Sequence, residues 1–141
     1  VTVLGALLLL LAPQNRTGAS GDARTLSFYH THTSETTSTL YWAEGEYLES
    51  GLQEINTILR DHRSGEIYTM DSRLLDLLYV LRSQVDSRET YQIISGYRSP
   101  ATNASLRKKS SGVAKRSYHM QGKAIDVRLP LGRTRLGGHP L

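Results

Sequence analysis

The chain has 141 residues, of which 38% are hydrophobic and 21% charged, and its formal net charge is +4. This length suits one domain with its own core, and the ordinary composition excludes both a disordered chain and a membrane bundle. The absence of cysteine excludes disulfides and thiolate metal sites. The positive charge fits an anionic partner, although the basic clusters Arg107-Lys108-Lys109 and Lys115-Arg116 are more typical of solvated surface.

Residues 1–23 are predicted to be a signal peptide or signal anchor followed by a linker. Their apolar run from Val3 to Ala12 is shorter than the ~20 residues that a spanning helix needs. It matches the hydrophobic core of a secretory signal, although no charged region precedes it and no clear cleavage site follows. A buried core helix is the alternative. The leucine run beside a polar linker favours export.

Residues 24–90, which follow the linker, are expected to form a hairpin and two helices. Alternation of apolar and polar residues predicts a strand at 24–30, and its partner strand is expected at 39–42. His30 and His32 would face opposite sides of the first strand. We therefore expect surface histidines that share no metal ion.

Two amphipathic helices are predicted next. One covers 45–62, and its apolar stripe at helical spacing consists of Leu48, Leu52, Ile55 and Leu59. The other is capped by Asp71 or Ser72. It is expected to bury a wide apolar face made of Leu74, Leu75, Leu77, Leu78, Leu81 and Val85.

The last part alternates strands with polar loops. A strand is predicted at 91–95, a short helix from Pro100 to about Lys109, and a returning strand at 124–129. The expected fold class is α+β, with helices packed on one face of a small antiparallel sheet. The open face of that sheet would carry the polar groups.

The stretch 91–130 concentrates the side chains with useful chemistry. His119 and Asp126 are separated by Gly122, which lets the chain turn and return. An imidazole and a carboxylate are zinc ligands, and a catalytic zinc has three protein ligands and an open water position. The same spacing also suits a buried His–Asp hydrogen bond. The sequence therefore indicates two ligands of a possible metal site.

Arg98 and Ser117 are the other candidates in this stretch. The guanidinium of Arg98, which stays protonated, could stabilise an oxyanion, and Ser117 could fix a substrate carbonyl or carboxylate. The alternative for Arg98 is a structural salt bridge with Glu89 or Asp126.

Four ordered motifs carry a family resemblance: R-T-L-S-F from Arg24, S-G-Y-R-S from Ser95, T-N-x-x-L-R from Thr102 and S-x-H-x-x-G-x-A-x-D from Ser117. Through them the chain, from Arg24 to about Pro130, resembles the murein endopeptidase K family. That family lies within the zinc metallopeptidases that include the D-Ala-D-Ala peptidases and the hedgehog fold. The resemblance implies a fold of this type.

The resemblance also implies roles for residues of this chain. His119 and Asp126 would be zinc ligands, Arg98 would steady the transition state, and Ser117 would bind substrate. In the family, a later segment with histidine-x-aspartate supplies the third ligand and the general base. Residues 24–141 are therefore expected to form a metallopeptidase-like domain truncated at its C-terminus. His139, between glycines and a proline, would be a poorly oriented substitute ligand.

The implied function is hydrolysis of peptide cross-links in peptidoglycan by an exported, monomeric zinc endopeptidase of the periplasm or cell envelope. An inactive module that binds peptidoglycan is the alternative, because a two-ligand site holds zinc weakly. A Ser–His–Asp hydrolase built on Ser95 or Ser117 lacks a G-x-S-x-G elbow. Nucleic-acid binding is disfavoured because no groove-reading helix or stacking motif accompanies the basic clusters.

Overall fold

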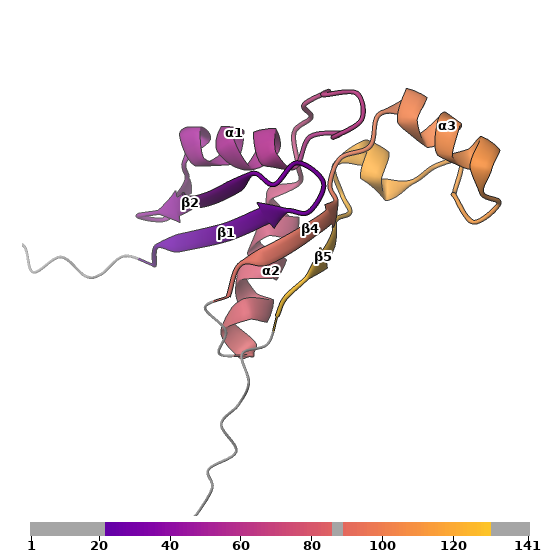
Figure 1. Ribbon diagram of the computed structural model, residues 1–141. Helices are drawn as coiled ribbons and strands as arrows, with labels where there is room; N and C mark the ends of the chain where they lie inside the picture. The colour runs from indigo at the N-terminus through magenta and orange to yellow at the C-terminus, as the bar shows by residue number, and fades with distance from the viewer. Residues whose placement is uncertain (1–21, 86–88, 131–141) are drawn as a thin grey trace, which may run out of the picture.

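The computed structural model describes residues 22–85 and 89–130 (Figure 1). The strands are β1 (Arg24–His30), β2 (Thr36–Ala43), β3 (Glu46–Tyr47), β4 (Tyr91–Ser95) and β5 (Asp126–Arg128). The helices are α1 (Glu49–Ile58), α2 (Ser72–Gln84), α3 (Pro100–Lys109) and the short 3-10 helix η1 (Tyr118–Gln121). This is an α+β fold, as the sequence predicts. The expected bounds of β1, β4 and α3 are confirmed.

The sheet has the order β3-β2-β1-β4-β5 and is mixed. Strand β1 pairs antiparallel with β2 but parallel with β4, and β4 pairs antiparallel with β5. The expectation of a purely antiparallel sheet is therefore corrected at one pair. The connection from β2 to β4 runs through α1 and α2, and such a crossover returns the chain in the direction of β1.

The core lies between one face of this sheet and helices α1 and α2. Alternate residues of β1 point into it, including the fully buried Leu26 and Phe28. Helix α1 crosses close to β2, because Gly51 has no side chain to strike the Leu40 carbonyl. Figure 1 shows α2 passing behind β1 and β4. The helices add Ile55, Ile58, Leu75 and Leu78 to the core.

Two expectations for the helical part are wrong. Gly45, with φ of +88°, lies in the turn between β2 and β3, so helix α1 begins only at Glu49. Helix α2 buries only Leu75 and Leu78 of its six expected core residues, while Leu77 remains 53% exposed. Within the described residues, Leu81 and Val85 of this face are exposed as well. Asp71 caps α2 as predicted, since its side chain accepts a hydrogen bond from the Arg73 N–H at 3.0 Å.

The mixed pairing decides where functional groups gather. Because β1 and β4 are parallel, their carboxyl ends lie at the same end of the sheet. Strand β5 starts at that end, where Asp126 pairs with Ser95. The chain segments that follow β1 and β4 and precede β5 therefore meet there. The candidate site residues therefore gather at this end of the sheet, while its exposed face carries polar groups such as the hydrogen-bonded Ser27 and Ser38.

Residues 1–21 of the predicted leader and linker at 1–23, and the tail at 131–141 with His139, lie outside the described residues. Among the helices of residues 22–85 and 89–130, none combines the length and the apolar character that crossing a bilayer requires.

Candidate functional site

His119 is held by a turn and by a strand end. The side chain of Ser117 caps η1 by accepting the N–H of His119 at 3.3 Å, and Gly122, with φ of +65°, ends this helix. The His119 ring lies 2.9 Å, through Nδ1, from the carbonyl oxygen of Gly96. A carbonyl can only accept, so Nδ1 carries the proton of this hydrogen bond. In the neutral ring, Nε2 is then left with its lone pair free for a metal ion.

Asp126 faces this lone pair. Its Oδ2 lies 3.4 Å from His119 Nε2, and the two side chains are 54% and 13% exposed respectively. The distance is longer than the ~2.7–3.2 Å of an ordinary N–H···O hydrogen bond. It agrees with the separation of about 3.3–3.5 Å expected for a nitrogen and an oxygen that bind one tetrahedral zinc. The separation is thus compatible with a shared cation, and the exposure of Asp126 shows that it is not a buried partner of His119.

The donor set is incomplete for a catalytic metal. Within the part of the chain that the structure describes, no cluster of three or more His, Cys, Asp or Glu side chains has the arrangement to hold a metal ion. His119 and Asp126 therefore account for two ligands of the three that a catalytic zinc uses. The described residues supply no third ligand beside this pair.

Arg98 lies beside His119, three residues beyond the end of β4. Its backbone N–H donates to the His119 carbonyl at 3.2 Å, and its Nη1 donates to Asn103 Oδ1 at 3.3 Å. Its Nε is buried without a hydrogen bond in the described part of the chain. The charged or titratable side chain that lies within 4.0 Å of the Asp126 carboxylate is His119 rather than Arg98. The Arg98 guanidinium therefore has N–H groups, including Nε–H, that can donate to a ligand.

Ser117 is buried and does not face the His119 ring. Its Oγ accepts the backbone N–H of His119, while the two ring nitrogens of His119 face Gly96 and Asp126. A serine nucleophile must hydrogen-bond to a ring nitrogen of its base. This geometry argues against a Ser–His–Asp hydrolase built on Ser117. The hydroxyl proton of Ser117 remains able to donate to a substrate oxygen.

Asp61 was not predicted from the sequence, yet it fixes the start of α3. It is 1% exposed and its Oδ2 accepts the Ser99 N–H at 2.9 Å, while Oδ1 accepts the Arg63 N–H at 2.9 Å. Burial alone raises the pKa of Asp61, but hydrogen bonds from Thr102, Ser99 and Arg63 outweigh it and hold the pKa below its usual range. The carboxylate thereby ties the loop after α1 to the segment that carries Arg98.

The expectation of surface histidines is wrong for His30, which is 1% exposed. His30, His32 and His62 form a cluster in which the rings of His32 and His62 stack at 4.3 Å between centroids. The His30 ring meets that of His62 at 5.4 Å, edge to face. Its Nδ1 accepts the His32 N–H at 3.2 Å, and its Nε2 is buried without a partner among the described residues. Burial is the main cause that lowers the pKa of His30, and that of His62 to about 4. No local sequence pattern indicates this cluster, because His62 comes from a distant loop.

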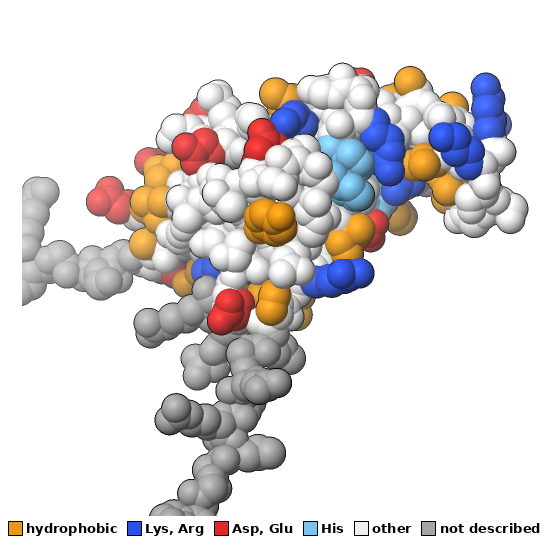
Figure 2. Space-filling view, viewed as in Figure 1, with side chains coloured by type: hydrophobic (Ala, Val, Ile, Leu, Met, Phe, Trp, Pro, Cys, Tyr) orange, Lys and Arg blue, Asp and Glu red, His pale blue; other side chains and the backbone are white. Residues whose placement is uncertain are grey.

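The visible surface around these residues is strongly basic. Figure 2 shows histidine side chains gathered on one face with Lys and Arg side chains beside them and over α3. The basic residues Arg107, Lys108 and Lys109 occupy the last turn of α3 and are exposed. An anionic ligand would be attracted to this side of the molecule.

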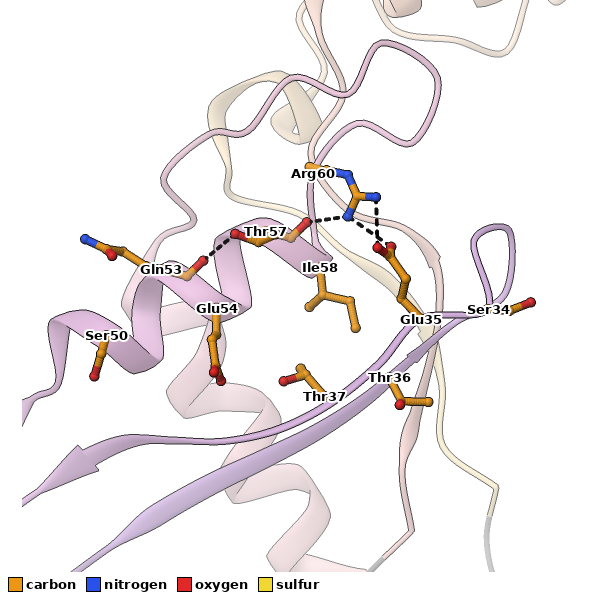
Figure 3. A pocket seen from close by; sticks show the side chains of 10 residues that line it. All are labelled: Ser34, Glu35, Thr36, Thr37, Ser50, Gln53, Glu54, Thr57, Ile58 and Arg60. Atoms are coloured by element: carbon orange, nitrogen blue, oxygen red, sulfur yellow. Dashed lines mark hydrogen bonds and ion pairs between the residues drawn. The ribbon is translucent and has the colours of Figure 1, made fainter.

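A polar cleft of about 740 Å³ lies elsewhere, between α1 and the hairpin of β1 and β2 (Figure 3). An ion pair between Arg60 and Glu35, 3.0 Å long, crosses one end of it. None of the four residues proposed from the sequence as site residues lines this cleft. The site at the sheet end is thus separate from it.

The structure brings an imidazole, a carboxylate and a guanidinium together at one end of a sheet, and these are groups that hydrolases use. Residues 18–134 match the family model of the peptidoglycan L,D-endopeptidase MepK. The chain therefore belongs to the family of this endopeptidase. No solved structure matches the chain significantly, so the expected likeness to the hedgehog and D-Ala-D-Ala-peptidase fold stays a prediction.

The relatives extend beyond the region they share with this chain. The peptidoglycan L,D-endopeptidases MepK of Escherichia coli K12 and of Shigella flexneri are each 37% identical to it over 126 residues. The matched region is 89% of this chain and 69% of each of those proteins. A Haemophilus influenzae relative is 36% identical over 107 residues, which are 75% of this chain and 58% of that protein.

Proposed function

We propose that this protein is a zinc-dependent endopeptidase that hydrolyses peptide cross-links in peptidoglycan. One observation carries the zinc part of the proposal, namely the 3.4 Å separation of His119 Nε2 and Asp126 Oδ2 with Nδ1 held by Gly96. A cation bound between these two acceptor atoms would offset their mutual repulsion, and zinc takes both imidazole nitrogen and carboxylate oxygen as ligands. Membership of the MepK family supports zinc and peptidoglycan as the metal and the substrate.

Each residue has a role in this proposal. His119 and Asp126 hold the zinc, and Gly96 fixes the tautomer and direction of the His119 ring. When bound, zinc would lower the pKa of a water ligand and polarise the scissile carbonyl. The guanidinium of Arg98 stabilises the oxyanion that develops on that carbonyl. Ser117 positions a substrate oxygen through its hydroxyl proton.

The substrate follows from the names of the relatives, which are L,D-endopeptidases. We infer that the cross-link cut by this protein joins two diaminopimelate residues of neighbouring peptides. These residues carry carboxylates, and the exposed basic residues near α3 would attract them. The protein is accordingly proposed to be exported to the periplasm or cell envelope and to act there as a monomer, without a nucleic-acid partner.

The experiment uses the purified chain, zinc and muropeptide dimers that carry this cross-link. Liquid chromatography with mass spectrometry is expected to show monomers that accumulate with time and disappear when a chelator removes the metal. The Asp126→Asn variant is expected to release far less product, because the amide is a weaker zinc ligand. Intact dimers in the presence of excess zinc would refute the proposed activity.

A second candidate function is a peptidoglycan-binding module without hydrolysis. The observation that favours it is the presence of only two ligands among the described residues. Sedimentation with insoluble peptidoglycan separates the two candidates. A binding module would sediment equally well with and without a chelator and leave the dimers intact, whereas the endopeptidase would cleave them.

A further inference from the structure

Asn103 lies at the centre of the hydrogen bonds that hold the site together. It is in the first turn of α3 and is only 2% exposed. Its Oδ1 accepts Nη1 of Arg98 at 3.3 Å, and its Nδ2 donates to the Ala114 carbonyl at 3.1 Å. An amide can donate and accept at once, which no apolar or carboxylate side chain of this size can do.

The two partners of Asn103 belong to the two segments that build the site. Arg98 lies in the segment after β4, and Ala114 lies in the loop that leads to Ser117 and His119. These segments meet again at the His119 carbonyl, which accepts the backbone N–H of Arg98 at 3.2 Å. Asn103 therefore closes a ring of contacts that contains both the guanidinium and the histidine.

The N-terminus of α3, from which the Asn103 side chain extends, is held by several hydrogen bonds. Its backbone N–H donates to the Ser99 carbonyl at 2.9 Å, and the Ser99 side chain caps α3 by accepting the Thr102 N–H at 3.2 Å. The buried Asp61 carboxylate in turn accepts the Ser99 N–H. A long arginine side chain is mobile unless such a group fixes it.

We propose that Asn103 is a positioning residue, which aims the Arg98 guanidinium at the reacting carbonyl and fixes the loop before His119. The inference rests on the proposed function for the identity of the reaction. Its geometric part, the placement of Arg98 by Asn103, is independent of that function. Asn103 itself touches neither the metal ligands nor the substrate in this account.

Two substitutions separate the two contacts of Asn103. Asn103→Ala removes both of them. Asn103→Asp keeps an oxygen for Arg98 but places a carboxylate oxygen opposite the Ala114 carbonyl, which it cannot satisfy. Ser105→Ala is the matched control, because Ser105 is exposed on the same helix. A residue that mattered only for folding would not distinguish Asn103→Asp from Asn103→Ala at Arg98.

The first readout does not need activity. The Nε–H resonance of Arg98 is followed by ¹H–¹⁵N NMR, because this buried group should exchange slowly with water when the side chain is held. We expect slow exchange in the wild type, in Ser105→Ala and in Asn103→Asp, and exchange at least about 10-fold faster in Asn103→Ala. Unchanged exchange in Asn103→Ala would overturn the inference. Should Asn103→Ala fail to fold, fast exchange in Asn103→Asp would overturn it instead.

The second readout is cleavage of muropeptide dimers. Misplacing a catalytic group by about 1 Å can cost ~10²-fold in rate, so Asn103→Ala is expected to lower kcat by about 10–10²-fold with KM nearly unchanged. Introducing Arg98→Ala into the Asn103→Ala variant should then lower kcat by a far smaller factor than introducing Arg98→Ala into the wild type. Additive losses would overturn the inference. An inactive wild type with the expected exchange rates would instead refute the proposed function and leave the placement of Arg98 by Asn103 supported.

Discussion

Gly122 is the residue that lets the chain turn between His119 and Asp126, and its replacement by alanine tests how tightly this turn is packed. An added Cβ would overlap the carbonyl oxygen of Thr69 and would lie 3.2 Å from Met70 Cα. The Gly122 carbonyl also accepts the Asp71 N–H at 2.9 Å, so the neighbouring chain cannot retreat without breaking a hydrogen bond. Gly122→Ala should therefore displace the turn that carries His119.

The loss of unfolding free energy in Gly122→Ala has a backbone part and a packing part, and a control variant separates them. Gly65 has φ of +77° and no atom within 4 Å of an added Cβ, so Gly65→Ala should cost only the ~1–2 kcal/mol of a left-handed residue. Gly122→Ala has the same backbone cost at φ of +65°, and overpacking adds about 1–3 kcal/mol. With a urea m-value of ~2 kcal/mol/M, the unfolding midpoint of Gly122→Ala should lie about 0.5–1.5 M below that of Gly65→Ala. Equal midpoints, measured by circular dichroism, would refute the packing argument.

Three further predictions concern stability and turnover. Burial lowers the folded-state pKa of His30 and of His62, the latter to about 4. The unfolded chain therefore binds more protons below about pH 6.5, and the urea midpoint should fall as pH drops from about 6.5 toward 4. A midpoint that is constant over this range would contradict the burial of these rings. Leu75→Ala should cost about 2–5 kcal/mol in the free energy of unfolding because Leu75 is fully buried, whereas Leu77→Ala should cost well under half as much. Arg98→Lys should leave the thermal midpoint nearly unchanged and lower turnover by about 10²–10³-fold, and the reverse pattern would make Arg98 a structural residue.

The sequence predicted those elements whose formation depends on local physical rules. Alternation of apolar and polar residues located β1 and β4, and a proline at the first helical position located α3. The four ordered motifs gave the family, which the comparison confirms over residues 18–134. The candidate ligands His119 and Asp126 were also named from the sequence, and they are adjacent in the structure.

The missed features all depend on contacts between distant segments. The parallel pairing of β1 with β4 follows from the path of two intervening helices, which no local pattern records. The buried His30 ring packs against the ring of His62, which comes from the loop after α1. Asn103 lies in a motif that carried the family resemblance, but its two partners could be seen only once α3 was placed against the loop at Ala114.

The zinc affinity of three forms of the chain, measured by isothermal titration calorimetry, tests the central claim most directly. The account predicts that the wild type and His32→Ala bind zinc equally, because His32 belongs to the cluster with His30 and His62. It also predicts that His119→Ala weakens zinc binding more than about 10-fold, since mutating even a residue that only hydrogen-bonds to a metal ligand lowers metal affinity by about that factor. Equal affinity of the wild type and His119→Ala, or a loss confined to His32→Ala, would contradict the placement of zinc between His119 and Asp126.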